Sequence, residues 1–345
     1  MDKEVLNVRQ TGNNYRAWKP DYDNFYSKKN FTEQMQCLLQ FAVLAPSSHN
    51  SQPWAFKITQ NGIDVLPASE RALAASDINH RQLYISLGCA IANLMIAADY
   101  YDLTFEINYL TDRVSIKLEP KLSTPTKDEN HLIFSIPRRT NNREKYKDSL
   151  PSLEFLNKFL NYDPNIQIHL IEDSKRREEI ADLTVQANIE AMKTKAFRKE
   201  LSKYIKNNFT KSFFGMPGFT IGMPSIVSLL APTIVKFLNV ARANKKQDTE
   251  LLKKFTPMFV IISTRDDNQV SWLKAGQIYE NIALEAVNQG LNTAVMAGII
   301  EIGDYHKKLQ VMLNTNFRPQ VFFRLGKALS FIRHSPRFKS KDVIL

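Results

Sequence analysis

The sequence predicts a protein of mixed helices and strands, and three stretches carry this prediction. Residues 87–104 and 275–292 each have apolar residues recurring at intervals of three and four, and each leads directly into an apolar strand-like run, 104–110 and 293–300. A third run, WAFKI at 54–58, follows a loop of turn-forming residues and reads as a strand. With 345 residues and 43% hydrophobic content, the chain can bury a large core in one to three domains.

The two helical stretches also resemble each other. Laid together without gaps, they pair Gly88 with Gly276 and Asn93 with Asn281, and two further positions are identical. Four identities are few, so chance similarity between two amphipathic helices is one reading. The shared Gly-x-x-x-x-Asn spacing favours the other reading, an internal duplication.

The loop at 44–58, LAPSSHNSQPWAFKI, packs turn formers, small hydroxyls, two side-chain amides and an indole into a short segment. Such groups end the preceding apolar helix and offer hydrogen-bond donors and acceptors to a planar polar ligand. An ordinary helix-loop-strand connection is the alternative. The candidate binding residues are Pro46, Ser47, Ser48, Asn50 and Gln52. We expect His49, inside this loop, to pack within it rather than to contact the ligand.

A second candidate segment is IPRRTNNREKY at 136–146, where three arginines fall within six positions. Guanidinium groups bind phosphate through paired, charge-assisted hydrogen bonds, and an amide between them can add a contact. Arg139, Asn141 and Arg143 are therefore candidate phosphate ligands. A solvated basic turn is the alternative, because charge runs usually lie on the surface.

Together the two segments resemble the nitroreductase family of FMN-dependent oxidoreductases. The loop matches that family's A-P-S-S-x-N-x-Q-P-W signature, which lies against the flavin, and the arginines match the spacing of its R-x-S-x-R segment, which holds the FMN phosphate. Asn141 replaces the usual serine or threonine. In a single nitroreductase subunit the arginine segment comes first, whereas here it follows the serine loop. The resemblance therefore implies two fused halves that build one site between them and bind one FMN per chain.

The C-terminal tail, FFRLGKALSFIRHSPRF, looks like that of the Acg-like subgroup, and the resemblance runs from about residue 31 to the end. It implies that Arg337, after Pro336, completes the phosphate site, with Arg324 and Arg333 as weaker candidates. A basic surface tail is an equal alternative. IIEIGD at 299–304 is similar to the I-E-G-x-D stretch that borders the flavin in many nitroreductases, and Glu301 occupies the acidic position.

The second half holds an insertion at about 187–255. It begins with a basic stretch, 193–211, that predicts an amphipathic helix, and continues with 213–235, which carries no charge over 23 positions. That length could cross a bilayer, but three prolines and three glycines interrupt it. We expect a lid that covers the flavin and excludes water. A peripheral membrane contact is the alternative, and we expect no integral membrane segment.

The resemblance implies an α+β fold, the FMN-dependent nitroreductase fold, with two fused halves forming a pseudo-dimer under a lid insertion. The predicted boundaries are an N-terminal extension at 1–30, a first half at 31–132, and a second half at 133–345 that includes the lid. Whether this pseudo-dimer stays monomeric or pairs into a homodimer is open.

The sequence gives little support for other functional classes. The net charge of +11 raises nucleic acid as a partner, but we expect this charge to be spread along the chain, and no zinc-finger or helix-turn-helix signature appears. Six histidines lack metal-ligand spacing, so no metal is expected. Cys37 and Cys89 lie in apolar helical stretches and should be buried. The N-terminus lacks an apolar signal region, which predicts a cytoplasmic protein.

The function that the resemblance implies is an FMN-dependent oxidoreductase, with NADH or NADPH as electron donor. Its acceptor would be a nitroaromatic, a quinone or a similar planar small molecule. No catalytic side chain is predicted, because a flavin carries the chemistry while the protein binds and orients it. The alternative is an FMN-binding protein that shelters the flavin beneath its lid with little turnover.

Overall fold

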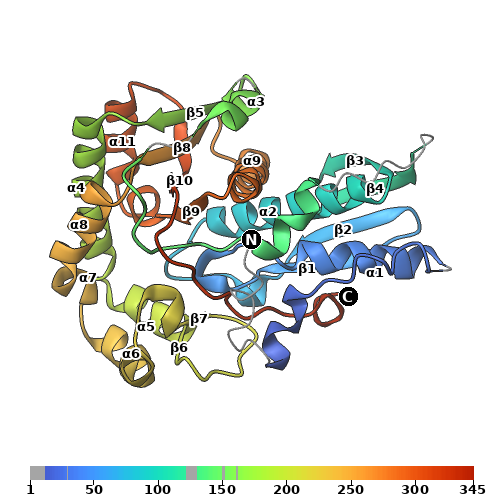
Figure 1. The fold of residues 1–345 in the computed structure, drawn as a ribbon, viewed down its shortest axis with the longest axis horizontal. Helices are drawn as coiled ribbons and strands as arrows, with labels where there is room; N and C mark the ends of the chain where they lie inside the picture. Colours follow the sequence, from blue (N-terminus) through green and yellow to red (C-terminus); the bar gives the residue numbers. More distant parts are fainter. Residues whose placement is uncertain (1–11, 29, 122–129, 150–151, 161) are drawn as a thin grey trace.

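Two four-stranded antiparallel sheets flank a central pair of long helices, α2 (Arg81–Tyr100) and α9 (Gln269–Asn288) (Figure 1). This architecture comes from a computed structural model that describes residues 12–28, 30–121, 130–149, 152–160 and 162–345. The first eleven residues of the predicted N-terminal extension lie outside the described part. The mixture of helices and antiparallel sheets confirms the α+β prediction.

The first sheet has the strand order β1-β2-β4-β3. Its strands are β1 (Trp54–Ile58), β2 (Gly62–Pro67), β3 (Leu103–Tyr109) and β4 (Val114–Pro120). Helix α1 (Phe31–Ala42) packs on α2 and precedes the serine loop, residues 45–52. Asn30 caps its start, since its side chain accepts a hydrogen bond from the Glu33 backbone N–H. The helix ends before Pro46, which has no N–H to donate to a helical carbonyl.

The second sheet has the strand order β5-β8-β10-β9. Its strands are β5 (Ile166–Ile171), β8 (Met258–Thr264), β9 (Asn292–Val295) and β10 (Arg318–Gly326). The helices around it are α3 (Asn157–Leu160), α4 (Ser174–Ala191), α8 (Lys245–Lys254), α10 (Gly298–Glu301) and α11 (Tyr305–Leu313). Seven of seven residues of β8 are buried, which makes this strand the centre of the second half's core.

The two sheets repeat one topology. Each is built in the chain order strand, strand, long helix, strand, strand, and the strands occupy equivalent places, from β1 and β5 at one edge to β3 and β9 at the other. Helices α2 and α9 are both 20 residues long. The matched order supports the internal duplication that the sequence suggested.

Contacts between α2 and α9 follow the same symmetry. A Cβ atom on Gly88 would lie 2.1 Å from the Leu273 carbonyl oxygen, and one on Gly276 would lie 2.0 Å from the Ile85 carbonyl oxygen. The alignment that pairs Gly88 with Gly276 also pairs Ile85 with Leu273, so the two contacts are reciprocal. Glycine is required at both positions because the helix backbones touch there.

The strand expected at 293–300 is shorter than predicted. Strand β9 ends at Val295, and Gly298–Glu301 form the short helix α10 instead. The Ala297 carbonyl accepts from the N–H groups of Ile300 and Glu301, which turns the chain away from the sheet. A Cβ atom on Gly298 would lie 2.2 Å from the Asn188 Oδ1 atom, so the glycine lets α10 approach α4 closely.

The tail of the second half crosses to the first half (Figure 1). After β10 the chain runs past the serine loop, and Ile344 forms a parallel bridge with Phe56 of β1. The Phe56 N–H donates to the Val343 carbonyl at 2.8 Å. The tail therefore fastens the two halves together.

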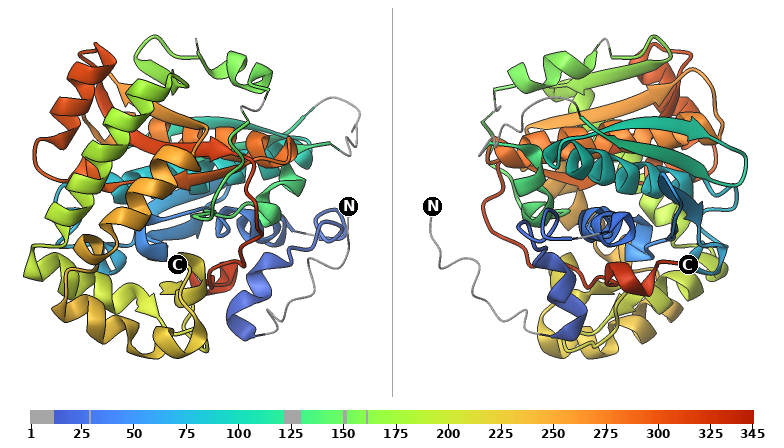
Figure 2. Two further views of the ribbon diagram at one scale, coloured as in Figure 1. Left: turned by 60° about the vertical axis from the view of Figure 1, so that its left-hand side comes forward. Right: turned by 90° about the vertical axis from the view of Figure 1, so that its right-hand side faces the viewer.

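Between α4 and α8 the chain leaves the second sheet and forms a separate lobe, which we call the lid lobe, residues 192–244 (Figures 1 and 2). Its elements are α5 (Lys195–Tyr204), β6 (Ile205–Lys206), β7 (Met216–Pro217), α6 (Ser225–Phe237) and α7 (Val240–Ala243). Buried side chains of these elements, including Ile205, Met216 and Val235, form a small core of their own. Figure 2 shows the lobe beneath both sheets.

Two further sequence expectations concern burial. Cys37 and Cys89 are both buried and unpaired with each other, which confirms the prediction. Within the described chain, α2 is the one helix whose length and hydropathy would allow it to cross a membrane, and 72% of that stretch is buried inside the protein.

Short 3₁₀ turns complete the described structure. They are η2 (Asn13–Trp18), η3 (Ser48–Asn50), η4 (Ser69–Arg71), η5 (Leu132–Phe134), η6 (Ile136–Arg138), η7 (Glu154–Leu156), η8 (Gly218–Ile221) and η9 (Ser340–Asp342). Of these, η3 lies in the serine loop and η8 in the lid lobe, and both contribute to the cavity described next.

Candidate functional site

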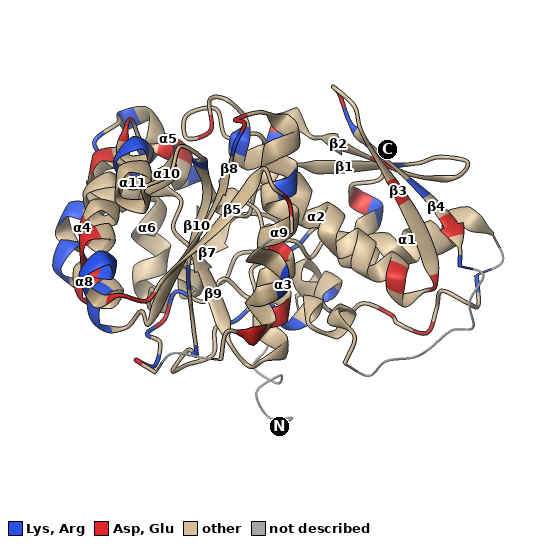
Figure 3. Ribbon diagram, turned by 90° about the horizontal axis from the view of Figure 1, so that it is seen from above, with Lys and Arg blue, Asp and Glu red and all other residues tan. Residues whose placement is uncertain are grey.

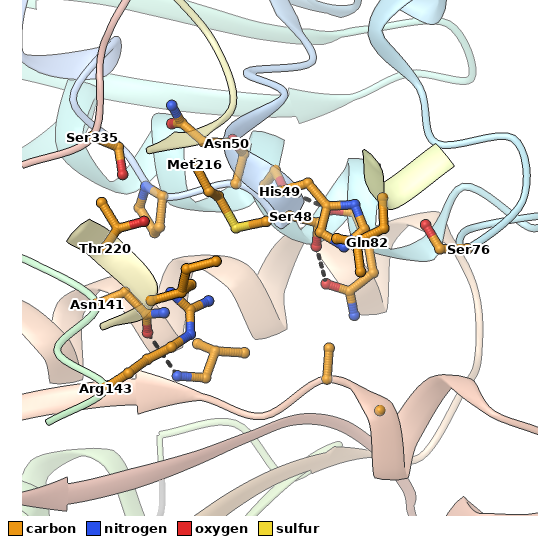
Figure 4. A pocket seen from close by; sticks show the side chains of 18 of the residues that line it. Ser48, His49, Asn50, Ser76, Gln82, Asn141, Arg143, Met216, Thr220 and Ser335 are labelled. Carbon is orange, nitrogen blue, oxygen red and sulfur yellow. Dashed lines mark hydrogen bonds between the residues drawn. The ribbon is translucent and has the colours of Figure 1, made fainter. Parts of the chain in front are cut away.

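A cavity of about 500 Å³ lies where the two halves, the tail and the lid lobe meet. The first half contributes the serine loop and one face of α2, and the second half contributes residues 139–143 and the β9–α10 segment. In Figure 4, Ser48, His49 and Gln82 lie on one side, Asn141, Arg143 and Thr220 lie on the other, and Met216 of the lid lobe lies between Thr220 and His49. Its volume falls in the usual range for small-molecule and cofactor sites.

The serine loop has an unusual backbone. His49, Asn50 and Gln52 have φ angles of 52°, 54° and 55°, in the left-handed region that non-glycine residues seldom adopt. Each such residue costs free energy, so surrounding contacts must hold the loop in this shape. Concentrated backbone strain of this kind is typical of binding loops.

Two hydroxyl groups fix the loop from inside. The Gln52 backbone N–H donates to the Ser47 Oγ atom at 2.9 Å, and the Ser48 hydroxyl donates to the Gln82 Oε1 atom of α2 at 2.8 Å. Pro46, Ser47 and Ser48 all line the cavity, as the sequence predicted they should if they bind a ligand.

Asn50 joins three parts of the molecule. Its side-chain amide donates to the carbonyl oxygens of Gly215 in the lid lobe and Pro336 in the tail, both at 2.9 Å. Its Oδ1 atom accepts from Arg337. The Gly215 N–H donates back to the Asn50 backbone carbonyl at 3.1 Å. The lid lobe is therefore bonded to both the side chain and the backbone of Asn50.

Gln52, also predicted to bind the cofactor, lies outside the cavity lining. It is fully buried, its amide donates to the Phe213 carbonyl at 2.7 Å, and its Oε1 atom accepts from the Phe338 N–H at 2.9 Å. Each polar end of the side chain makes one hydrogen bond, and these bonds fasten the loop to the lid lobe and the tail. The structure therefore gives Gln52 a positioning role, and its contact with a cofactor stays a prediction.

Arg139 lines the cavity but is already paired. Its Nε atom lies 3.1 Å from a carboxylate oxygen of Glu280 on α9, and both side chains are buried. Burial raises the pKa of Glu280 to about 7, against the opposing influence of Arg139 and Arg337. The positive charge of Arg139 is therefore shared with an internal acid.

Arg143 differs from Arg139 in having no such partner. Among the residues that the structure describes, its guanidinium makes no hydrogen bond and no ion pair, although it lines the cavity. Burial, and then the nearby charge of Arg324, lower the pKa of Arg143. An uncompensated, partly buried cation that faces a cavity is most readily satisfied by an anionic ligand group.

Asn141 and Glu301 contact the cavity while also holding structure. The Val295 N–H donates to the Asn141 Oδ1 atom at 2.8 Å, which ties the arginine segment to β9. Glu301 accepts hydrogen bonds from Arg81 and Gln82, so it links α10 of the second half to α2 of the first. Its negative charge is thereby balanced by Arg81.

The structure distinguishes the tail arginines. Arg337 lines the cavity, donates to the Ala45 carbonyl at 3.1 Å and lies over the Trp18 ring, and burial lowers its pKa to about 9. Arg333 also lines the cavity, with its guanidinium 4.0 Å from the Phe219 ring centre. Arg324 is fully buried and lies outside the cavity lining, where it donates to the carbonyl oxygens of Asn142 and Glu144.

His49 lines the cavity beneath the lid lobe. Its ring centre lies 5.7 Å from that of Tyr204 and 6.3 Å from that of Phe197, so it packs against α5. Burial lowers the pKa of His49 to about 4, which keeps the imidazole neutral at physiological pH. Its Nδ1 atom is buried and has no hydrogen-bond partner among the described residues.

Several lining residues were missed by the sequence reasoning. Gln82, Ile85, Ser86 and Cys89 form one face of α2 toward the cavity. Their spacing of three and four residues was a usable signal, since this places them on one side of a helix. Asp248 of α8 also lines the cavity, and burial raises its pKa to about 6, but its charged helix reads in sequence as a solvated face.

The lining as a whole suits a flat ligand that carries an anionic group. An unpaired guanidinium stands near one wall, hydroxyl and imidazole groups line another, and apolar side chains of the lid lobe cover the space between them. The bound group would be enclosed, because the lid lobe is hydrogen-bonded to the serine loop through Phe213 and Gly215. These features fit an aromatic cofactor with a phosphate.

Comparisons with known proteins give a consistent family. No family model matches the chain. The chain is 22% identical over 314 residues to "Putative NAD(P)H nitroreductase acg" of Mycobacterium tuberculosis, which covers 86% of this chain and 90% of that protein. It is 27% identical over 120 residues to "Putative NAD(P)H nitroreductase Rv3131" of the same species, a match that spans only 34% of that relative's length.

Two solved structures are also similar. A "putative nitroreductase" from Anabaena variabilis covers 95% of this chain and 97% of its own, with 9% identity and a TM-score of 0.44. A variant of the FMN- and NADPH-dependent nitroreductase NfnB covers 62% of this chain, with 14% identity and a TM-score of 0.39. Neither TM-score reaches 0.5, so the assignment depends on the sequence relatives and on the motifs.

Proposed function

Since the chain belongs to the nitroreductase family and is similar to its Acg-like members, we propose that its cavity holds one FMN and transfers electrons from NADH or NADPH to a planar acceptor. The single observation that carries the proposal is Arg143, an arginine at a motif position that lines the cavity and has no ion-pair partner among the described residues. The acceptor class is a nitroaromatic, a quinone or a similar flat molecule.

Each part of the cavity has a role in this proposal. Arg143 would bind the FMN phosphate, and Arg333 or Arg337 would add positive potential to that region. Ser47, Ser48 and the strained backbone around them would contact the ring system. When bound, the flavin supplies hydride acceptance and electron transfer, so no acid–base side chain is required.

The protein's own contribution is enclosure and electrostatics. The lid lobe holds the serine loop in its strained shape through Asn50, and it would keep water from a bound ring. Arginine charge near the site would favour an anionic reduced cofactor. Asp248, held partly neutral by burial, is the one lining acid in the described chain that has no ion-pair partner.

One site per chain follows because each half contributes a different part of the site. The first half supplies the serine loop, and no basic residue precedes that loop within α1. In the second half, the place before the edge strand is taken by α3 and the approach to β5. A mirror-image site would therefore lack both the arginines and the serines.

The phosphate assignment can be tested with a single substitution. Arg143→Met should weaken FMN binding by roughly 10- to 100-fold, the loss expected for a charge-assisted contact. Lys147→Met, an exposed basic residue four positions later, is the matched control and should keep its flavin. Full flavin content in purified Arg143→Met protein would show that the phosphate binds elsewhere.

The double variant Arg139→Ala/Arg143→Ala should also lose FMN, but it is a less specific test. Removing Arg139 leaves the buried Glu280 carboxylate without its ion-pair partner, which destabilises the fold itself. Loss of flavin in the double variant must therefore be read beside its unfolding transition, whereas the single variant leaves the buried pair intact.

Turnover is tested by anaerobic titration of the flavin-loaded protein with NADH and then NADPH. Bleaching of the flavin absorbance would support an oxidoreductase and lead to assays with nitro and quinone acceptors. Flavin that stays bound and oxidised would favour the second candidate, an FMN-sequestering protein. The hydrogen bonds that fasten the lid lobe over the cavity are the observation behind that candidate. Failure to bind added FMN would overturn both.

A further inference from the structure

Helix α6 of the lid lobe exposes an apolar surface to solvent. Ile226 is 82% exposed, Leu229 56%, Leu230 63% and Phe237 65%. These side chains lie within one 13-residue helix, so they form a continuous patch rather than scattered apolar residues. Contiguous exposed patches of this kind usually mark a surface that docks on something else.

Packing within the lobe explains why the patch stays outside. The buried residues of α6 are Ser228, Ala231 and Val235, spaced three and four apart, and this single stripe covers the small core of the lobe. The rest of the helix is just as apolar, although a surface helix ordinarily presents polar residues there. Fold stability alone gives no reason for leucine and isoleucine on the outer side.

The charge of the protein gathers on the same lobe. Residues 192–244 hold nine lysines and arginines and one acid, whereas the rest of the chain holds 37 basic and 34 acidic residues. The expectation that the charge would be spread along the chain is therefore wrong. Most of the net charge of +11 belongs to the lid lobe.

The arrangement of these charges leaves the outside of the lobe basic. The one acid, Glu200, accepts hydrogen bonds from the backbone N–H groups of Ala75 and Ser76, so it faces the first half. On α5, which packs against α6, Lys195, Lys199 and Lys203 are exposed and recur every four residues, on one side of the helix. In Figure 3, α6 is tan along its visible turns, whereas α8, which follows the lobe, carries both blue and red marks.

An apolar helix face beside a basic helix is the composition of a segment that lies in the headgroup region of an anionic membrane. A crossing is excluded by length, since 13 residues of helix span about 20 Å and a bilayer core is about 30 Å thick. A second copy of the chain is disfavoured as the partner, because two strongly basic lobes would repel each other.

We propose that the outer face of the lid lobe docks on the surface of an anionic lipid bilayer, with the α6 patch in the headgroup region and the α5 lysines against acidic lipids. The inner side of the same lobe lines the cavity through Met216 and Thr220. The docked protein would thus present the roof of its cavity to the membrane. The proposal is independent of which acceptor the site reduces.

The first test is co-sedimentation of the full-length protein with vesicles. Protein should bind vesicles of phosphatidylcholine with one-third phosphatidylglycerol, bind pure phosphatidylcholine at least tenfold less, and dissociate in about 0.5 M salt, where surface charges are screened. No binding to the anionic vesicles, or equal binding to both kinds, would overturn the proposal.

Two sets of variants assign the binding to the lobe. Ile226→Gln/Leu230→Gln should weaken vesicle binding about tenfold, while Val311→Gln, an 81% exposed residue on α11, should change nothing. All three side chains are exposed, so folding is preserved, and an unchanged thermal unfolding transition provides the check. Unchanged vesicle binding in the α6 variant would overturn the assignment.

The charge component is tested in the same way. Lys195→Gln/Lys199→Gln/Lys203→Gln should weaken binding to anionic vesicles roughly 100-fold, because each basic residue near an acidic surface contributes several-fold. The matched control replaces three exposed lysines elsewhere, Lys57, Lys147 and Lys341, by glutamine and should bind as the parent does. Equal loss in both triple variants, or a concentration-dependent dimer abolished by the α6 substitutions, would contradict docking on lipid.

Discussion

The two halves share a framework but differ in the connection between their first two strands. In the first half, β1 and β2 are joined by residues 59–61, whereas in the second half β5 and β8 are joined by residues 172–257. The strands on either side keep the same antiparallel pairing. The sheet therefore tolerates a large insertion between these two strands. The insertion includes the lid lobe, which forms the roof of the cavity.

A second difference lies just before the edge strand. The first half has the strained serine loop before β1, and the second has the short helix α3 before β5. In a homodimer every substitution appears twice, so both sites must keep all parts. A fused chain lets each half retain one part of a single site, while positions where the halves touch must stay alike.

The largest expected effect tests this symmetry directly. Gly88→Ala and Gly276→Ala should each lower the free energy of unfolding by about 3 kcal/mol, because each added Cβ would press on a backbone carbonyl of the opposite helix. Urea unfolding of the two variants measures this, and each serves as the control for the other. A large loss in one variant beside none in the other would break the symmetric contact.

The serine loop, which only the first half has, should give a pH signature. Burial holds the pKa of His49 at about 4, below the ordinary value of 6.5, so the unfolded chain binds a proton that the folded chain refuses. The free energy of unfolding therefore loses nothing to this group above pH 6.5. It falls as the pH drops toward 4, by about 3 kcal/mol from His49 alone. Urea unfolding at pH 6.5 and at pH 4 measures the loss in the free energy of unfolding, which should be smaller in His49→Asn than in the parent protein.

The matched control is His80→Asn, an exposed histidine with a similar left-handed backbone. It should keep the pH profile of the parent protein. If His49→Asn lost as much stability between pH 6.5 and 4 as the parent does, the histidine of the serine loop would not be held neutral by burial.

Substitution of Asn50 tests how far the serine loop depends on its bonds to the lid lobe and the tail. Asn50→Gly should cost about 2 kcal/mol, because it strands the buried partners Gly215, Pro336 and Arg337, while glycine accepts the φ angle of 54° without strain. Asn314→Gly, at an exposed helix end with φ of 53°, is the control and should be near neutral. Equal thermal midpoints for the two variants would mean that the bonds of Asn50 contribute nothing.

The smallest expected effect concerns the contact between the lid lobe and the first half, which Glu200 makes. Glu200→Gln should reduce global stability by about 1 kcal/mol, since a neutral amide oxygen accepts more weakly from Ala75 and Ser76. Hydrogen exchange of the α5 amides should quicken, because the lobe opens more often. Glu190→Gln, at a surface pair with Lys193, should leave that exchange unchanged. Identical exchange in both variants would show that this anchor does not hold the lid lobe down.

Much of the fold was predictable because the signals are local. The helical periodicity found α2 and α9, and the turn residues at 44–53 placed the loop and the strand WAFKI at 54–58. The alignment of Gly88 with Gly276 anticipated the contact between the halves, since a glycine is needed wherever two helix backbones touch. The early end of β9 was missed, because the apolar run MAGII reads equally well as strand or buried helix.

The site was harder to predict, because long-range partners decide what each side chain is free to do. Arg139 and Arg143 look alike in sequence, yet only Arg139 meets Glu280 from a distant helix. Gln52 reads as a ligand-binding amide until Phe213 and Phe338 are seen to occupy both its ends. The roles of Pro46, Ser47, Ser48, Asn50, Asn141, Glu301 and Arg337 in cofactor binding stay predictions.

The entry and exit of the long second-half connection lie side by side. Ile171 of β5 pairs with Phe259 of β8, much as Ile58 pairs with Ile63 across the three-residue turn of the first half. Loop-closure entropy grows only slowly with length, so a hairpin whose ends already meet can accept or lose a whole lobe at little cost. The replaceable part is the lid lobe alone, residues 192–244, because α4 and α8 on either side of it pack on the second sheet through Ile180 and Leu252. A chain with a short link from α4 to α8 should retain both sheets, and families built on this frame can change what covers the cavity without rebuilding what surrounds it.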